Sequence, residues 1–525
     1  MNFYKMLFLT VLILCSGNMF GTERLLSQNG LAMLKVIAKK DIDWQQTVKF
    51  SQKGRCKLNY RLSFNYQPSS TSRPFACLAL IKPIGLKDLQ LNGKVVPLPL
   101  AGMSYKKITN IPISMLKTGK NILTGNFTID VRGRKRKGKL QLRPKELAGQ
   151  SVAVALYGMT LDDFVFEHAP ILGWAGTDFF TVSTRINMSG KVTLRLNGQA
   201  YQTSDSGMLH KFKVTGLKSN TLYSYTLTAE KAGHKISAKT FQVKTYPKSG
   251  SFSFVALGDS RSQPKEWRKV AAAVVKKQPL FVLFDGDMVQ NGKYNYQWLE
   301  QLFRPAPQFF ATIPQYVAIG NHEREDRLFY QILQGPTNRY RWSQQIGEVL
   351  VIIINGTKEW KTGSDNMQWL EKQLRHSRAK FIFLCSHYPA WSLGTHTRLN
   401  KAGRARETTV YHARKYIMPL LKKYRATAMF AGHDHFYERS ESPDGVTMIL
   451  TGGAGAPIRT KYNPGNLTSE QLEKFWQKQN PYSKVWVAKY HFCLITVDGD
   501  QCTMQAITPT GEVIDNITWQ ARKIK

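Results

Sequence analysis

Two histidines flank an aspartate directly after a short apolar run in AMFAGHDH, residues 428–435. Imidazole and carboxylate groups bind metals as well as protons, but one His-x-His pair does not distinguish a metal site from a polar turn. Four other apolar runs end in similar groups. Their ends read LGDSR (257–261), FDGDMVQNG (284–292), IGNHE (319–323) and CSHYP (385–389). The recurrence predicts one shared site rather than five unrelated turns.

The metal-competent side chains in these segments stand just beyond the apolar runs, in four of the five after a glycine. Ligands of open α/β sheets collect beyond the carboxyl ends of the strands. A glycine lets the chain turn tightly and approach an ion. Mixed carboxylate, imidazole and amide donors suit Mn, Fe or Zn. The predicted metal ligands are Asp259, Asp287, Asn321, His387, His433 and His435.

The elements that must position these side chains alternate between strand and helix over residues 248–525. Runs such as FSFVAL and FIFLC are typical of buried strands, whereas PKEWRKVAAAVVKK (264–277) has helical spacing. The alternation predicts an α/β domain with a central sheet.

The residues before this domain alternate apolar and polar positions between turns, which predicts two β-sandwiches. Residues 22–160 have jelly-roll-like character, similar to modules attached to carbohydrate-active enzymes. Their role is unknown, and an anionic polymer or a glycan is a possible ligand. In residues 161–247, Leu217, Tyr223 and Tyr225 stand where fibronectin-III-like sandwiches have a leucine turn and a tyrosine pair.

Residues 1–21 have the pattern of a secretory signal peptide. Lys5 precedes an apolar stretch that ends at Cys15, which is too short to span a membrane. LILC resembles a bacterial lipobox, but Leu14 stands where a small residue is usual, so lipoprotein anchoring is the less favoured alternative. We expect a secreted or periplasmic protein without a transmembrane segment; the oligomeric state is not predicted.

The chain is strongly basic, with 74 Lys and Arg against 35 Asp and Glu. The charge is spread along the sequence, and the densest run, RGRKRKGK (132–139), is expected to be a solvated hairpin loop rather than a polyanion-binding patch. Basic stripes interleaved with aromatics are absent from the sequence, so no specific nucleic-acid partner is expected. The positive field favours anionic substrates and surfaces.

Five cysteines follow Cys15. If Asp498 and Gly499 form a two-residue hairpin loop, the Cβ atoms of Cys493 and Cys502 are diagonal neighbours about 7 Å apart, too far for a disulfide. A bridge between Cys56 and Cys77 is the better candidate. Cys385 is expected to be a buried thiol.

The series of motifs resembles the calcineurin-like metallophosphoesterases, most closely the bacterial relatives of purple acid phosphatases. GNHE, SHYP, GHDHFYERS and TGGAGAP carry the resemblance, together with the small sandwich before them. It covers about residues 165–515. It implies a four-layer α/β fold for residues 248–525 and a site for two divalent or trivalent metal ions, drawn from Fe, Mn and Zn.

The resemblance also implies how the ligands divide. Asp287 would bridge both ions, with Asp259 and His435 on the first. The second ion would be held by Asn321, His387 and His433.

The chemistry implied by such a pair is hydrolysis of a phosphate ester. Two cations polarise phosphoryl oxygens and activate water as hydroxide. His322 would act as the general acid that protonates the leaving group. Glu323 either supports His322 from behind or is a surface carboxylate, and the sequence leaves both open.

The chain departs from its relatives at two positions. Many relatives have Asp-x-His where this chain has Asp259-Ser260-Arg261, and purple acid phosphatases have a tyrosine where this chain has Gln290. Arginine cannot bind a cation, so the first ion has three evident protein ligands. No tyrosinate charge-transfer band is expected. Arg261 either binds the substrate phosphate as a catalytic residue or forms an ion pair at the mouth of the site.

Two further segments have open roles. His396 and Arg398 in GTHTRLN either reach the substrate or belong to a polar surface loop, and His396 is taken as a substrate-binding candidate. Residues 466–484 form either a lid or a packed excursion.

The predicted function is an exported binuclear-metal phosphoesterase, an acid-phosphatase-like phosphomonoesterase. Two alternatives stay open. One is a phosphodiesterase or nucleotidase of the same fold. The other is a surface glycan-binding protein whose catalytic domain is degraded.

Overall fold

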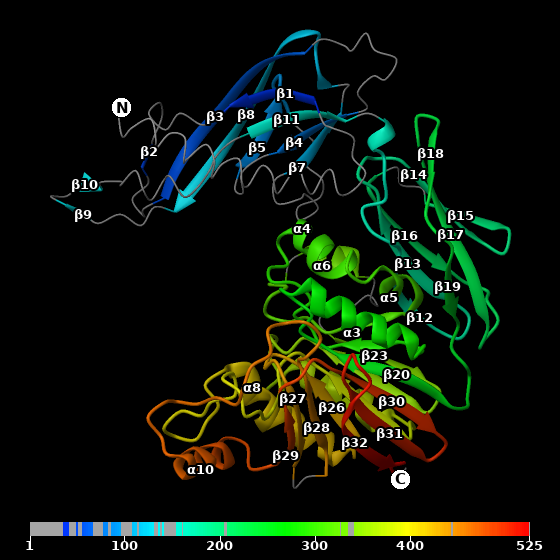
Figure 1. The fold of residues 1–525 in the computed structure, drawn as a ribbon, viewed down its shortest axis with the longest axis vertical. Helices are drawn as coiled ribbons and strands as arrows, with labels where there is room; N and C mark the ends of the chain where they lie inside the picture. Colours follow the sequence, from blue (N-terminus) through cyan, green and yellow to red (C-terminus); the bar gives the residue numbers. More distant parts are fainter. Residues whose placement is uncertain are drawn as a thin grey trace. The chain divides into compact units, whose positions relative to one another are not determined.

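The computed structural model describes most of the chain from residue 161 onward (Figure 1). Described residues are 161–523 without 204–206, 326, 334–340 and 443–444, and before them 35–40, 49–50, 55–66, 77–81, 86–95, 108–112, 115–130, 135–136, 139–140 and 154–159. The predicted signal peptide, residues 1–21, lies outside the described residues. The predicted bridge between Cys56 and Cys77 concerns side chains that are also outside the description.

The chain divides into two compact units, residues 1–165 with 231–234, and residues 166–230 with 235–525. In its described residues the first unit contains the two-stranded sheet β9–β10 and two larger antiparallel sheets. One has the order β1-β11-β4-β7, with strands Lys35–Lys40, Val154–Met159, Cys77–Ile81 and Ile108–Pro112. The other has the order β2-β3-β8-β5-β6, with strands Lys49–Phe50, Arg55–Tyr66, Gly119–Asp130, Leu86–Leu91 and Lys94–Val95. The jelly-roll-like character of this region stays a prediction.

At the basic run, strands β9 (Lys135–Arg136) and β10 (Lys139–Leu140) pair antiparallel, and the solvated hairpin loop stays a prediction. After the short helix η2 (Leu161–Asp163), two further antiparallel sheets follow. One has the order β12-β13-β16, with strands Ile171–Ala175, Phe180–Arg185 and Leu209–Val214. The other has the order β15-β14-β17-β18 with β19 beside β17, and its strands are Gln199–Gln202, Lys191–Leu196, Leu222–Lys231, His234–Ser237 and Phe241–Lys244.

These small sheets are joined to the C-terminal α/β region through buried hydroxyl groups. The hydroxyl of Tyr225 donates to the carbonyl of Ala311 (2.7 Å), and those of Tyr246 and Tyr316 are 2.7 Å apart. A buried hydroxyl needs such a partner. Residues 166–230 and 235–247 therefore pack as part of the same unit, and the fibronectin-III-like assignment stays a prediction.

The α/β region contains two sheets, as the four-layer fold implied by the family resemblance requires, whereas the alternation of strands and helices alone predicted one central sheet. The first has the order β22-β21-β20-β30-β31-β32, with strands Gln315–Val317, Val282–Phe284, Phe252–Leu257, Phe492–Asp498, Gln501–Ile507 and Val513–Gln520. The second has the order β23-β24-β25-β26-β28-β27-β29, with strands Arg341–Ile346, Val349–Ile354, Phe381–Cys385, Ala428–Ala431, Thr447–Thr451, Tyr437–Glu441 and Ser483–Val487. The two sheets pack against each other through edge-to-face ring contacts, because the ring centroid of Phe383 of β25 lies 5.4 Å from that of Phe254 of β20 and 5.9 Å from that of Trp519 of β32.

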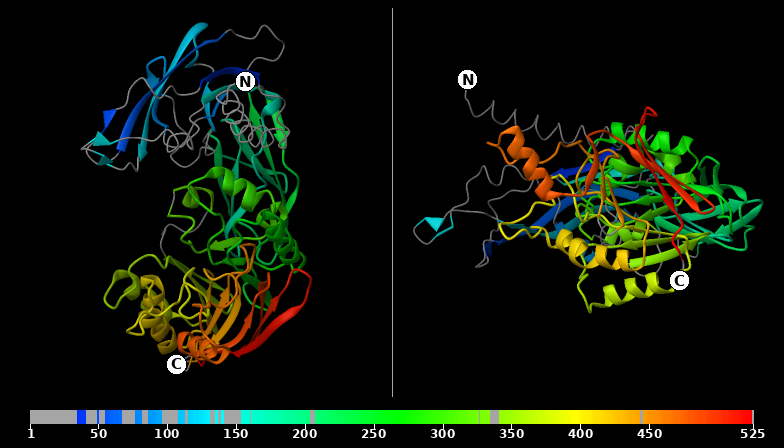
Figure 2. Two further views of the ribbon diagram at one scale, coloured as in Figure 1. Left: turned by 60° about the vertical axis from the view of Figure 1, so that its left-hand side comes forward. Right: turned by 90° about the horizontal axis from the view of Figure 1, so that it is seen from below.

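Helices cover the outer face of each sheet, which gives a helix–sheet–sheet–helix order (Figure 2). On the first sheet lie α3 (Pro264–Lys276), α4 (Asn295–Gln297), η3 (Trp298–Phe303) and α5 (Pro307–Thr312), followed by α6 (Arg327–Ile332). The second sheet packs against α7 (Asp365–His376), α8 (Thr408–His412), η4 (Ala413–Ile417) and α9 (Met418–Lys423) through a continuous apolar cluster. Helix α10 (Ser469–Gln479) begins in a capping box between Thr468 and Gln471.

Trp267 anchors α3 to the first sheet. Its ring is fully buried, lies 5.8 Å from Phe284 and donates its indole N–H to the carbonyl of Leu302 (2.9 Å). We expect Trp267→Ala to lower the free energy of unfolding by about 3–5 kcal/mol, because it leaves a large cavity. Trp267→Phe should cost clearly less, since it keeps a ring. Denaturant unfolding of both variants tests this, and equal costs would contradict it.

The C-terminal hairpin corrects one detail of the sequence analysis. Asp498 pairs with Gln501, so the two-residue loop is Gly499-Asp500 and the register shifts. Cys493 then pairs with Ala506, and Cys502 with Val497. Both thiols are free and buried, as is Cys385. Among the described residues, none of the helices is long and apolar enough to cross a membrane.

Candidate metal centre

The five strand ends named from the sequence meet at one place between the two sheets. Strands β20, β21 and β22 run parallel in the first sheet, and β25 and β26 run parallel in the second. Their carboxyl ends therefore lie at corresponding edges. The structure brings together all six predicted ligands, which are Asp259, Asp287, Asn321, His387, His433 and His435.

The turns that carry these residues are tight and unusual. The backbone is left-handed at Asp259 (φ 57°), Asp287 (φ 51°) and His433 (φ 79°). Residues other than glycine are uncommon in that region, and such strain collects at functional sites. A Cβ atom on Gly432 would lie 2.2 Å from Oδ2 of Asp259. The glycine is therefore required for the close approach of the two strand ends.

The donors of the second predicted ion point their lone pairs at one another. Nδ1 of His387 lies 2.9 Å from the carbonyl oxygen of Asp285, which places the ring proton on Nδ1. Its Nε2 then carries a lone pair, 3.1 Å from Oδ1 of Asn321 and 3.4 Å from Oδ1 of Asp287. Lone pairs facing each other at these distances repel unless a cation lies between them.

His433 adds a further lone pair to the same point. Its Nε2 lies 2.9 Å from a carboxylate oxygen of Glu407, so Nε2 carries the proton. Its Nδ1 faces Nε2 of His387 at 3.1 Å. Two buried imidazole nitrogens without a proton between them fit a shared cation of the Fe, Mn or Zn class. The donor set of the second ion thus fits a metal.

The donors of the first predicted ion fit a metal less completely. Nδ1 of His435 lies 2.9 Å from the carbonyl oxygen of Pro457, which leaves the lone pair on Nε2. That nitrogen is 3.4 Å from Oδ1 of Asp259, a buried oxygen that receives no hydrogen bond from the described residues. However, NH2 of Arg261 lies 3.2 Å from the same nitrogen and can donate to it. Arginine therefore competes with a cation for His435.

The two departures from the family pattern contact each other. NH1 of Arg261 donates a short hydrogen bond to Oε1 of Gln290, and Nε of Arg261 lies 3.4 Å from Oδ2 of Asp287. Arg261 as a whole is 8% exposed. Arg261 thus forms the ion pair that the sequence analysis considered, at the predicted bridging carboxylate. A substrate phosphate would have to share this guanidinium with Asp287.

Comparison with known proteins relates this part of the chain to phosphoesterases. Residues 252–437 match the family model of calcineurin-like phosphoesterases. The chain is 26% identical to probable purple acid phosphatase 20 of Arabidopsis thaliana over 315 residues, 53% of this chain and 70% of the relative. It is 24% identical to human tartrate-resistant acid phosphatase type 5 over 198 residues, 32% of this chain and 57% of that protein. Residues 252–437 are therefore a calcineurin-like phosphoesterase domain, and the chain is similar to purple acid phosphatases.

The fold of this chain is also similar to that of a solved purple acid phosphatase structure. Purple acid phosphatase PPD1 from yellow lupin (Lupinus luteus) seeds superimposes with a TM-score of 0.57 at 17% identity, over 88% of this chain and 93% of that one. At this identity the match shows a shared fold alone. The human and several plant relatives are matched over little more than half of their length.

His322 lies at the open side of the centre of the phosphoesterase domain. Its backbone N–H donates to Oδ1 of Asp287 (2.9 Å), and its Nδ1 lies 2.7 Å from the carbonyl oxygen of Gln290. Nε2 therefore faces the centre, 3.7 Å from Oδ2 of Asp287. Burial lowers the pKa of His322 and the Asp287 carboxylate raises it, with a net downward shift. A protonated His322 is thus favoured by acidic pH.

Glu323 is not a surface carboxylate. It is fully buried, and its two oxygens accept hydrogen bonds from the backbone N–H groups of Asp287 (3.0 Å), Met288 (2.8 Å) and Gly320 (2.7 Å). Burial and the Asp287 carboxylate raise the pKa of Glu323 to about 8, while the three N–H donors oppose this shift. Glu323 thus ties the turn of β21 to the turn of β22, and its hydrogen bonds go to the backbone rather than to the ring of His322.

We expect Glu323→Gln to weaken both the fold and metal binding. The amide has one acceptor oxygen, so at least one buried N–H loses its partner, at a cost of about 1–3 kcal/mol. Loosening the Asp287 turn should lower metal affinity about tenfold or more. Glu473→Gln on exposed α10 is the matched control. Thermal unfolding and metal titration of both variants measure the effect, and an unchanged Glu323→Gln protein would refute it.

Glu407 is a residue that the sequence analysis missed. One carboxylate oxygen lies 2.9 Å from Nε2 of His433, and the other lies 2.7 Å from Nδ1 of His396. Burial alone would raise the pKa of Glu407, but the hydrogen bonds with His396 and His433 lower it to about 2. The carboxylate therefore stays ionised and orients His433. No motif marks Glu407, because its contact depends on how a loop folds back.

His396 lies beside the centre and not in a remote surface loop. Its ring centroid is 3.8 Å from that of His433. Burial lowers the pKa of His396, but the hydrogen bond with Glu407 outweighs it and the net shift is upward. A ring that is protonated more readily than usual can face an anionic substrate, so the predicted substrate-binding role remains open to test.

Proposed function

We propose that this protein hydrolyses phosphate monoesters with two metal ions, of the Fe, Mn or Zn class, bound between the two sheets. The observation that carries the proposal is the convergence of donor lone pairs from five strand ends. His387 Nε2 lies within 3.4 Å of donor atoms of Asp287, Asn321 and His433, all without a proton to share. Such a cluster is stable in a folded protein when cations neutralise it.

The position of each residue gives it a role in metal binding or in proton transfer. His387, His433, Asn321 and Asp287 would hold one ion, and Asp259, Asp287 and His435 the other. When bound, the ions supply Lewis-acid activation of a water nucleophile and of the phosphoryl group. His322, fixed through the carbonyl of Gln290, would hold a proton on Nε2 and deliver it to the leaving oxygen.

Arg261 would act on the phosphate from the side of the first ion. Its guanidinium lies between Asp287 and His435, where its charge favours an anionic substrate and disfavours a neighbouring cation. We therefore propose that the ion held by Asp259 and His435 binds more weakly than the ion held by His387 and His433.

A substrate panel tests the proposal. The full chain is freed of metal with a chelator, reloaded with Mn, Fe or Zn, and assayed on 4-nitrophenyl phosphate and bis(4-nitrophenyl) phosphate. We expect turnover of the monoester that disappears with the metal and returns on reloading, with slower turnover of the diester. A faster diester reaction would favour a phosphodiesterase, and a metal-loaded protein inert on every ester would favour a degraded catalytic domain.

A further inference from the structure

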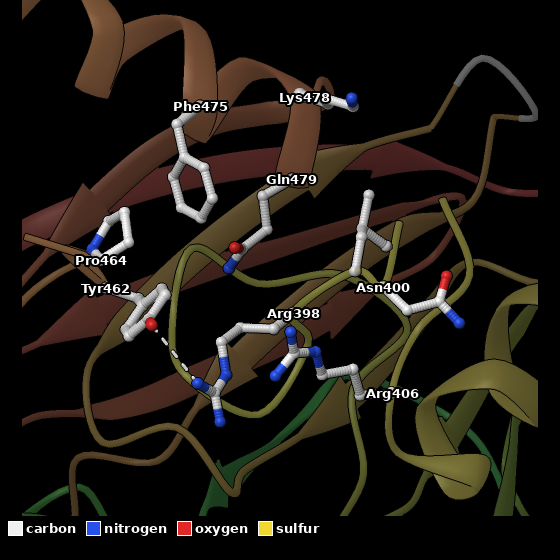
Figure 3. Close-up of a pocket in the computed structure, with 9 residues that line it drawn as sticks. Arg398, Asn400, Arg406, Tyr462, Pro464, Phe475, Lys478 and Gln479 are labelled. Atoms are coloured by element: carbon white, nitrogen blue, oxygen red, sulfur yellow. Dashed lines mark hydrogen bonds between the residues drawn. The ribbon is translucent and has the colours of Figure 1, made fainter. Parts of the chain in front are cut away.

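A cavity of about 260 Å³ lies between the loop that follows β25 and helix α10 (Figure 3). Its lining combines cationic, aromatic and amide side chains. The residues that matter here are Arg398, Arg406, Lys478, Tyr462, Phe475 and Gln479. Such a combination differs from the metal centre, whose donors are carboxylates, imidazoles and an amide.

One hairpin carries residues of both the cavity and the surroundings of the metal centre. Residues 396–407 form a small hairpin, in which Leu399 pairs with Ala405 and the N–H of Arg406 donates to the carbonyl of Arg398 (2.9 Å). The two ends of this hairpin are His396 and Glu407, which contact His433. Arg398 is two residues from His396, so their Cα atoms are at most about 8 Å apart.

The cationic side of the cavity lacks an anionic partner. Figure 3 shows Arg398 and Arg406 side by side below Gln479. Across the described part of the chain, no carboxylate pairs with Arg398, Arg406 or Lys478. Like charges held together without a counter-charge repel. A bound anion would remove this repulsion.

Arg398 is held in place while Arg406 is free to bind. Nε of Arg398 donates to the carbonyl of Thr395 (2.8 Å), and its guanidinium lies 4.9 Å from the ring centroid of Tyr462. The side chain of Arg406 is exposed and makes no hydrogen bond to the described residues. An arginine presented in this way can bind a carboxylate, sulfate or phosphate through two N–H groups.

The opposite side of the cavity suits a flat, partly polar molecule. The rings of Tyr462 and Phe475 lie 5.9 Å apart at 55°. Nε2 of Gln479 donates to the carbonyls of Ser392 and Gly394, whereas its Oε1 is buried and receives no hydrogen bond from the described residues. Gln479 is 3% exposed. A buried acceptor without a donor is unfavourable, and a ligand N–H or O–H would satisfy it.

We propose that this cavity binds the leaving group of the substrate and selects phosphate esters whose leaving group carries a second anionic group. The hairpin links the two sites, since its ends contact His433 and its arms carry Arg398 and Arg406. A molecule with an ester phosphate at one end and an anion on a flat ring at the other matches both. This specificity rests on the proposed function, because it assigns a subsite of the same reaction.

Two esters that differ by one carboxylate test the proposal. The full chain, loaded with metal, is assayed on benzyl phosphate and 4-carboxybenzyl phosphate. We expect kcat/KM to be about tenfold higher for the carboxylated ester, which is the size of effect that one charge-assisted pair gives. Arg406→Gln should remove most of this preference, and Arg406→Lys should keep part of it. Lys401→Gln removes the same charge from the same hairpin outside the cavity and should keep the preference.

The outcomes distinguish binding of the carboxylate in the cavity from a non-specific effect of positive charge on the hairpin. A wild-type protein with no preference overturns the proposal, and so does an equal loss of preference in Arg406→Gln and Lys401→Gln. Calorimetric binding of the same two esters tests ligand binding in the cavity separately from hydrolysis. If neither ester is hydrolysed but the carboxylated ester binds more tightly and Arg406→Gln removes that difference, the cavity assignment stands while the catalytic proposal fails. Equal binding of both esters overturns the cavity assignment.

Discussion

Asp287→Asn should lower kcat/KM for phosphate monoesters by about 10³-fold or more, the largest loss expected from any single substitution. Oδ1 of Asp287 lies 3.4 Å from Nε2 of His387, and Oδ2 lies 3.4 Å from Nε of Arg261. One oxygen therefore faces a donor of one predicted ion, and the other pairs with Arg261, whose NH2 lies 3.2 Å from Nε2 of His435, a predicted donor of the other ion. Asparagine keeps the size of the side chain but removes the charge and one acceptor oxygen, and losses of this kind at a charged centre reach that magnitude.

The fold should survive this change. An amide oxygen can still accept the hydrogen bond that the N–H of His322 donates to Oδ1. Asp178→Asn, at an exposed position of the same unit, is the matched control and should keep full activity. Steady-state kinetics at saturating metal measures both variants, with thermal unfolding to verify the fold. Activity of a folded Asp287→Asn protein within tenfold of wild type would show that Asp287 does not bridge the ions.

His322→Ala should produce the second largest loss, and its size should depend on the leaving group. General acid catalysis by a histidine contributes about 10²–10⁴-fold. An alkoxide needs the proton to leave, so we expect a loss in that range for benzyl phosphate. The 4-nitrophenolate ion leaves without protonation, so the loss for 4-nitrophenyl phosphate should be much smaller.

The leaving-group dependence separates acid catalysis from a structural role. His376→Ala removes an exposed histidine whose Nδ1 contacts only the helix carbonyl of Lys372 (2.8 Å), and it should change neither rate. If His322→Ala slows both esters equally, His322 supports the site and does not donate a proton. The geometry argues for donation, because the carbonyl of Gln290 fixes Nδ1 and leaves Nε2 facing the centre.

Much of the candidate site follows from local sequence. Each predicted ligand stands at the end of an apolar strand, and parallel strands place such ends at one edge. The glycine before Asp287 is also explained locally, since the chain has φ 101° at Gly286 and a Cβ atom there would lie 2.7 Å from the backbone nitrogen of Gly320. Strand ends and glycines thus predict where the site is.

The parts that could not be predicted depend on contacts between distant segments. The apolar strands by themselves fit one sheet or two; the strand pairing shows two, as the family resemblance implied, and Phe254 packs on Phe383 between them. Glu407 reaches His433 because a hairpin folds back, and nothing in the spacing of the two residues indicates this. The pairing of Arg261 with Gln290 likewise joins two departures that the sequence shows as independent.

The metal content of the purified chain decides whether the converging side chains hold two ions. Wild-type protein and Asp287→Asn are loaded with Mn, Fe or Zn, dialysed, and analysed by elemental emission for ions per chain. We expect two ions per wild-type chain, of which the one held by Asp259 and His435 is lost first on dilution, and fewer than one per Asp287→Asn chain. A wild-type chain that retains no ion under any loading condition, or a variant that retains as many as wild type, would contradict it.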